Sequence, residues 1–189
     1  IINADKKSLE LHNDHGNAIA MCYNHMIMPL ANLNDKITQV KWGVSDFRFH
    51  FGREPEGIWL PETACNDETV EVLISEGIKY IILDTSQAAY TRKLGEEKWS
   101  DVNDNSIDPK VPYRRFSEIN RSMYLDIFFY DGPVSKSVAF DDVLVSSQNL
   151  LNKIHSASDV TIASPDDAVT EGLAKTGQLI GVATDGETF

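Results

Sequence analysis

The sequence predicts an α/β fold in which short buried strands alternate with amphipathic helices around a mainly parallel sheet. Three observations support this prediction. Apolar runs of strand length alternate with segments of helical periodicity, and no internal repeat interrupts the order. The 189 residues are also enough for one globular domain with a real core.

The clearest helix is predicted over residues 34–50. Apolar residues recur through it at helical spacing, and Gly52 follows as a stop. Asn34 or Asp35 is expected to cap its amino end. A second helix is expected after the cap Asn66. Apolar runs predict strands at 57–60, 80–83, 123–130, 160–163 and 179–184.

The remaining segments complete one expected domain over residues 1–189. Apolar residues between 138 and 154 predict one or two helices, and Ser164 followed by Pro165 is typical of a further helix start. Residues 91–121 are polar and irregular. A stretch of this length is expected to be a functional loop or a hairpin insertion.

The net charge of the chain restricts the classes of ligand that we expect it to bind. The chain has 17 basic and 29 acidic residues and a formal charge of -12. We therefore expect neither nucleic acid nor an anionic membrane as a partner, because both would be repelled. Neutral sugars fit better. We see neither a leader segment nor a membrane span, so a cytoplasmic setting is expected. The two cysteines, Cys22 and Cys65, are expected to be buried free thiols.

Carboxylates follow four of the predicted strands, namely Glu62, Asp84, Asp131 and Asp185. Ligands of parallel α/β sheets bind at the carboxyl ends of the strands, so these acids are expected to converge on one site. An Asp after a strand is also a preferred helix cap, and that alternative stays open for each of them. Glu62 fits the alternative least, because Asn66 already caps the next helix.

Two features around these acids indicate sugar chemistry. Asp185 is separated from Glu187 by Gly186 alone, and carboxylates held close together raise one another's pKa, which separates an acid from a base. Aromatic side chains also lie beside the acids, and sugar rings present apolar faces to such groups. Trp59 is the aromatic residue that precedes Glu62 most closely. The pair Glu62 and Asp185 is therefore expected to cleave or transfer sugar bonds.

Histidines near the amino end leave a metal site open as an alternative. His12, Asp14 and His15 could bind a metal, but the segment has no clear helix and no third strong ligand. We expect neither a metal nor a cofactor, since the glycine patterns of nucleotide-binding loops and of dinucleotide sites are also absent. His25 is expected to be either a hydrogen-bonded core residue or part of the sugar site.

Five motifs in chain order resemble glycoside hydrolase family 57, especially its branch with a second conserved C-terminal domain. The resemblance covers nearly the whole chain, and the combination is specific although each motif alone is short. The motifs are GNAIA at 16–20, YNHMIMPL at 23–30, PEGIWLPETA at 55–64, FFYDGP at 128–133 and ATDGET at 183–188.

The resemblance implies an incomplete (β/α)7 barrel and a retaining mechanism on α-glucans such as starch, glycogen or maltooligosaccharides. It also implies that Glu62 is the nucleophile and Asp185 the general acid/base. Hydrolysis, branching and glucan transfer share this pair, and the sequence leaves the choice open. The substrate-binding residues predicted beside the pair are Asn17, His25, Trp59, Asp131 and Glu187.

The two ends predict that the chain is a fragment of the catalytic barrel. The chain opens at Ile1 without a Met and stops at Phe189 shortly after a charged turn. The His-Gln-Pro-like motif of the family's first strand and the His-rich stretch after its Asp-Gly-Glu turn are both absent. A barrel without its first strand would have an open edge.

Two other functions compete with the glycosidase. The first is a metal-dependent polysaccharide deacetylase on a related barrel, which would need zinc held by Asp and paired His residues. The second is a glucan-binding module or inactive remnant that keeps the carboxylates for structure. The oligomeric state stays open.

Overall fold

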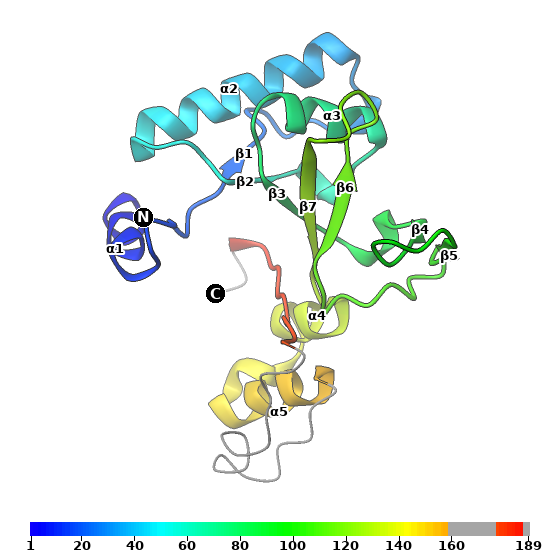
Figure 1. The fold of residues 1–189 in the computed structure, drawn as a ribbon. Helices are drawn as coiled ribbons and strands as arrows, with labels where there is room; N and C mark the ends of the chain where they lie inside the picture. Colours follow the sequence, from blue (N-terminus) through cyan, green and yellow to red (C-terminus); the bar gives the residue numbers. More distant parts are fainter. Residues whose placement is uncertain (159–176, 187–189) are drawn as a thin grey trace. The chain divides into compact units, whose positions relative to one another are not determined.

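The computed structural model describes residues 1–158 and 177–186, and the chain divides into two compact units (Figure 1). The expectation of a single domain over residues 1–189 stays a prediction. The first unit comprises Ile1–Leu83 and Tyr113–Ile127, and the second comprises Asp84–Pro112 and Phe128–Phe189.

A five-stranded sheet with the order β1-β2-β3-β7-β6 organises the first unit. Neighbours β1, β2 and β3 pair in parallel, whereas β6 and β7 form an antiparallel pair. The predicted α/β fold with a mainly parallel sheet is confirmed, and β1 and β6 are additions to the predicted strands. The strands are β1 (Ala20–Met21), β2 (Gly57–Trp59), β3 (Tyr80–Leu83), β6 (Tyr113–Phe116) and β7 (Tyr124–Phe129).

The predicted long helix is confirmed as α2 (Leu33–Phe51), but its cap differs from the expectation. Asn32, in an extended conformation, accepts a hydrogen bond from Asp35 N–H. Asn34 and Asp35 already lie inside the first turn, where their side chains cannot take the cap position. The predicted cap Asn66 is confirmed at α3 (Asp67–Ser75).

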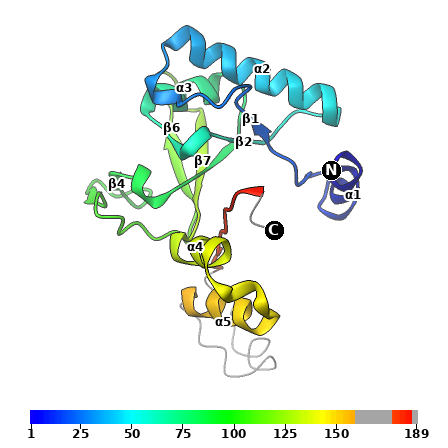
Figure 2. The same ribbon diagram turned by 180° about the vertical axis from the view of Figure 1, so that it is seen from behind.

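The core of the first unit lies between the sheet and two helices. In both views α2 and α3 lie side by side, and α2 also packs against β1 (Figure 2). The buried Lys36 of α2 pairs with Glu68 of α3. The fully buried side chains include Met28, Val40, Ile58, Leu60, Leu73, Ile81 and Leu125.

Within residues 84–112, 128–158 and 177–186, the second unit contains a small hairpin and two α-helices. The predicted one or two helices between 138 and 154 are found as two. The strand expected at 160–163 and the helix expected from Ser164 lie outside the described residues. None of the described helices is both long and apolar enough to cross a membrane. The elements are β4 (Tyr90–Thr91), β5 (Ser100–Asp101), α4 (Gly132–Phe140) and α5 (Ser147–Ala157).

The strand expected at 179–184 is wrong in extent, because among the described residues this segment forms a single bridge, between Tyr130 and Gly181. The neighbouring backbone groups bond in other directions. Leu179 N–H donates to Lys110 O at 3.0 Å, and Ala183 N–H donates to the Ser135 hydroxyl at 3.1 Å. A ladder needs successive bonds to one neighbour, so the segment stays irregular.

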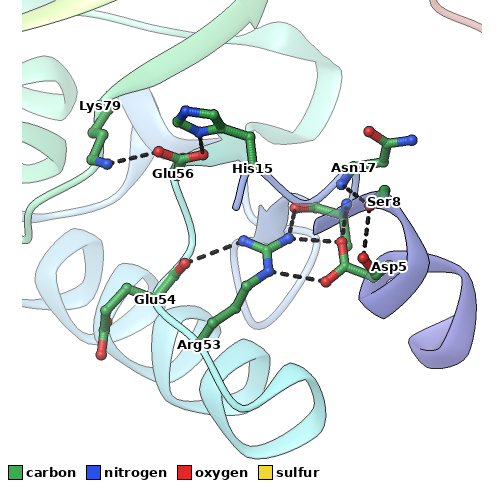
Figure 3. A network of polar contacts seen from close by, with 9 residues as sticks. Asp5, Ser8, His15, Asn17, Arg53, Glu54, Glu56 and Lys79 are labelled. Carbon is green, nitrogen blue, oxygen red and sulfur yellow. Dashed lines mark hydrogen bonds and ion pairs between the residues drawn. The ribbon is translucent and has the colours of Figure 1, made fainter. Parts of the chain in front are cut away.

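An ion pair between the buried Asp5 and the half-buried Arg53 joins α1 (Ile2–Leu11) to the end of α2 (Figure 3). Arg53 Nε and Nη2 donate to the two carboxylate oxygens of Asp5 at 2.9 and 2.8 Å. Arg53 Nη2 also donates to Ala18 O, and Asp5 accepts from Ala18 N–H. The hydrogen bonds from Arg53 hold the pKa of Asp5 below its ordinary value of 3.8, although burial acts in the opposite direction.

Replacing Arg53 by Met is expected to lower the free energy of unfolding by about 3 kcal/mol, because Asp5 would stay buried without its partner. Chemical denaturation at pH 7 measures this, and Arg48→Met, which removes an exposed pair with Glu54, is the control with little expected effect. The folded pKa of Asp5 is lowered, so its contribution is present above about pH 4 and lost below. A penalty that stays unchanged down to pH 2 would contradict this.

Candidate active site

Glu62 lies in a tight turn that directly follows β2. The turn is the 3₁₀ segment η2 (Pro61–Thr63), and hydrogen bonds from Thr63 N–H and Ala64 N–H close it. Glu62 and Thr63 both have left-handed backbones, with φ of 55° and 51°. Non-glycine residues in this conformation store strain of about 1–3 kcal/mol, and such strain clusters at functional sites.

His25 meets Glu62 across the ends of two parallel strands. His25 follows β1 and Glu62 follows β2, and the pairing of Met21 with Trp59 brings both strands to the same edge. His25 Nε2 lies 2.9 Å from Glu62 Oε1. Their side chains are 65% and 68% exposed, so this contact contributes little to stability and leaves both groups accessible to a ligand.

Trp59 and Asn17, two predicted substrate-binding residues, lie at opposite ends of the strands. Trp59 is the last residue of β2 and is half-buried, three residues before Glu62. Asn17 precedes β1, and its N–H donates to the Ser8 hydroxyl at 2.9 Å. The structure therefore brings His25 to Glu62 but places Asn17 at the amino end of β1. The substrate-binding roles of Trp59 and Asn17 stay predictions.

The residues after His25 line an open hollow of about 370 Å³ in the first unit. It runs along η1 (Met28–Leu30) to the start of α2 and has a mixed lining of apolar and polar groups. A surface of this kind suits a sugar ring, which has apolar faces and a polar rim. The hollow is lined by Met26, Ile27, Leu30, Ala31, Asn32 and Asp35.

Asp84 caps the short 3₁₀ helix η3 (Thr85–Gln87) in the second unit, where it accepts from Ser86 N–H at 2.8 Å. It also bonds the Tyr130 hydroxyl. Burial acts to raise the pKa of Asp84, but the bonds from Ser86 and Tyr130 outweigh it and lower the pKa. Burial, followed by the bond to Asp84, raises the pKa of Tyr130. Sequence reasoning missed this pair, although each partner directly follows a buried apolar run.

Asp131 caps α4, where its carboxylate accepts from Val134 N–H at 2.8 Å. Its own N–H donates to Gly181 O at 2.8 Å. The helix-cap alternative thus describes both Asp84 and Asp131. One oxygen of Asp131 is occupied by the cap, and its role in substrate binding stays a prediction.

The second predicted catalytic acid, Asp185, lies in the second unit and is exposed. It follows the irregular segment that bridges Tyr130 at Gly181. Glu187 lies outside the described residues. Glu62 belongs to the first unit and Asp185 to the second, so the separation of their carboxyl groups stays a prediction.

Metal ligands do not gather within residues 1–158 and 177–186, where no group of three His, Cys, Asp or Glu could hold an ion. His15 of the candidate cluster instead bonds Glu56 at 2.7 Å. Cys22 and Cys65 are both thiols, and Cys22 is buried as expected, whereas Cys65 is half-buried, contrary to the expectation. Burial raises the pKa of Cys22 to about 11 and that of Cys65 to about 12, so neither is a thiolate at neutral pH.

Glu62 thus combines a strained backbone with a place at the carboxyl end of a parallel strand, and both features are common at the functional sites of α/β enzymes. The family model of Glycosyl hydrolase family 57 matches residues 8–189, and the chain belongs to this family. A search of curated proteins found no significant match.

Three solved enzyme structures share the fold. A maltose-forming amylase from Pyrococcus sp. ST04 is 15% identical with a TM-score of 0.62, over 97% of this chain and 27% of its own. A 4-α-glucanotransferase from Thermococcus litoralis is 17% identical with a TM-score of 0.60, over 97% and 23%. An α-amylase from Thermotoga maritima is 15% identical with a TM-score of 0.61, over 100% and 44%. The chain thus spans less than half the length of each.

Because Glu62 has a left-handed backbone, we expect the usual order of stability of Ala and Gly variants to be reversed at position 62. Glu62→Gly is expected to be about 1 kcal/mol more stable than Glu62→Ala, because only Gly relieves the strain. At an ordinary position Gly is the less stable of the two. Urea denaturation of both variants measures the difference, and a more stable Ala variant would show that the turn is unstrained.

Proposed function

We propose that this chain carries the catalytic part of a retaining glycoside hydrolase or glucanotransferase that acts on α-glucans. Its sheet would form part of an incomplete (β/α)7 barrel. The observation that carries the proposal is the carboxylate of Glu62, which a strained turn presents to solvent beside His25 in a family 57 chain. Because a contact this exposed adds little stability, a function at the carboxylate is the better reason for the strain.

In the first step Glu62 attacks the anomeric carbon. Its Oε1 lies against His25 Nε2, and when that nitrogen carries the proton His25 donates to Oε1. Oε2 is then the oxygen that forms the bond to carbon, through an oxocarbenium-like transition state. Asp185 donates its proton to the leaving glycosidic oxygen as the bond to that oxygen breaks.

In the second step the covalent glycosyl ester on Glu62 is released. Asp185, now a carboxylate, takes a proton from water or from an acceptor sugar, whose oxygen attacks the anomeric carbon. Two displacements retain the anomeric configuration. Retention requires the two carboxyl groups to lie roughly 5 to 5.5 Å apart in the complete site, whereas inversion needs about 6.5 to 9.5 Å.

The family and the surface charge support α-glucans as the substrate class. The similar structures are named as amylases and as a glucanotransferase, and α-glucans are the substrates that these names imply. A formal charge of -12 suits a neutral polymer. Starch- or glycogen-type polysaccharides and maltooligosaccharides are therefore the proposed substrates.

Incubation of the full-length natural protein with maltooligosaccharides, followed by chromatography, is expected to give new products. Shorter products alone mean hydrolysis, and shorter and longer products together mean transfer. The same samples report retention, because α-anomers form first when the configuration is kept. Absence of turnover on maltooligosaccharides, starch and glycogen would contradict the proposed function.

Glu62→Gln is expected to lower turnover by about a thousandfold or more, because the amide removes the nucleophile and keeps the shape. Glu10→Gln, an exposed acid on α1, is the matched control and should keep wild-type turnover. Near-normal activity of Glu62→Gln would show that Glu62 is not the nucleophile.

A further inference from the structure

A buried glutamine on α2 accepts hydrogen bonds from the chain that leads from β1 to His25. Tyr23 N–H donates to the main-chain carbonyl of Gln39 at 3.2 Å, and Asn24 N–H donates to Gln39 Oε1 at 2.7 Å. Gln39 is only 6% exposed. One residue of the helix therefore receives two consecutive N–H groups directly before His25.

Two neighbours of Gln39 on the same helix contact the same segment. A Cβ on Gly43 would lie 1.9 Å from Met21 O, so only glycine lets the strand end approach α2 this closely. The Trp42 ring meets the Tyr23 ring edge-on, with centroids 5.5 Å apart. Residues three and four apart lie on one face of a helix. One face of α2 therefore contacts this segment through Gln39, Trp42 and Gly43.

This face of α2 explains how an exposed imidazole is aimed at Glu62. The His25 side chain is 65% exposed, so packing does not fix its direction. Its direction is set by the backbone before it, and Gln39 bonds that backbone one residue earlier. Gln39 lies beside the buried Val40 and four residues before the buried Gly43, where an apolar side chain would need no hydrogen bond. A buried amide here is best explained by the N–H that it binds.

We propose that Gln39 is a positioning residue, which fixes the backbone of Tyr23 and Asn24 so that His25 reaches Glu62. The contacts of Gln39, Trp42 and Gly43 are sufficient to support the fixing of this backbone. Its consequence for catalysis rests on the proposed function of Glu62. The competing explanation is that Gln39 only attaches β1 to α2.

The test uses Gln39→Met in the full-length natural protein, because Met keeps the side-chain length and removes the acceptor. With ¹⁵N-labelled histidine, the imidazole nitrogen signals of His25 are assigned by their loss in His25→Ala. In folded Gln39→Met these signals are expected to move toward those of a free imidazole. On maltooligosaccharides kcat is expected to fall about tenfold with KM changed about twofold or less, since a small misplacement of a catalytic group acts mainly on the chemical step.

A double-mutant cycle separates positioning from mere stability. On the His25→Ala background Gln39→Met should lower kcat/KM no further, whereas independent effects would multiply. Gln148→Met makes the same exchange at an exposed position of α5 and should leave kcat/KM and the His25 signals unchanged. Gln39→Glu keeps an acceptor for Asn24 N–H and should preserve the His25 signals, which provides a test if Gln39→Met does not fold.

Three results would each overturn the inference. They are unmoved His25 signals in folded Gln39→Met, moved His25 signals in Gln39→Glu, and a multiplicative loss of kcat/KM in the cycle. A wild-type protein that turns over no glucan would instead overturn the proposed function, and the His25 signals would still decide whether Gln39 positions the imidazole.

Discussion

The parallel pairing of β1 with β2 is the constraint on which the candidate site depends. Ala20 lies opposite Ile58 and Met21 opposite Trp59, so both strands deliver the following residues to one edge of the sheet. A shift by one residue would turn every side chain of β1 to the opposite face. The buried Ile58 fixes the orientation of β2, and the close approach of Gly43 to Met21 fixes that of β1.

The two ends of these strands serve different purposes. At the amino end, the buried Asp5 and the half-buried Arg53 form a hydrogen-bonded ion pair that joins α1, α2 and the approach to β1. At the carboxyl end, Glu62 and His25 are exposed and the backbone of Glu62 is strained. The amino end of the strands thus carries stabilising contacts, whereas the carboxyl end, where a ligand would bind, carries backbone strain. This division is common in α/β enzymes, whose sites lie at the carboxyl ends of strands.

The sequence predicts those elements whose local signals are strong. Three elements could be predicted because each depends on neighbours in the chain, namely the apolar spacing of α2, the cap Asn66 and the strand at 80–83. β1 has only two residues, Ala20 and Met21, and its pairing is decided by distant partners. The segment 179–184 has a strand-like composition, but its backbone groups bond a loop carbonyl and a serine hydroxyl instead of one strand.

The same distinction applies to the site. The place of Glu62 after a strand was predictable from Trp59, Pro61 and the separate cap of the next helix. Its positive φ was not, because neither Gly nor Asn marks the turn. Gln39 interrupts the apolar stripe of α2, but only the folded backbone shows that it binds Asn24 N–H.

Covalent trapping tests most directly whether Glu62 is the nucleophile. The full-length natural protein would be incubated with a 5-fluoro-α-glucosyl fluoride, which forms a slowly hydrolysed glycosyl ester with retaining enzymes, then digested and analysed by mass spectrometry. We expect the added mass on the peptide that contains Glu62, and its absence in Glu62→Gln. A label on any other carboxylate, or turnover of glucans without a label on Glu62, would contradict the account.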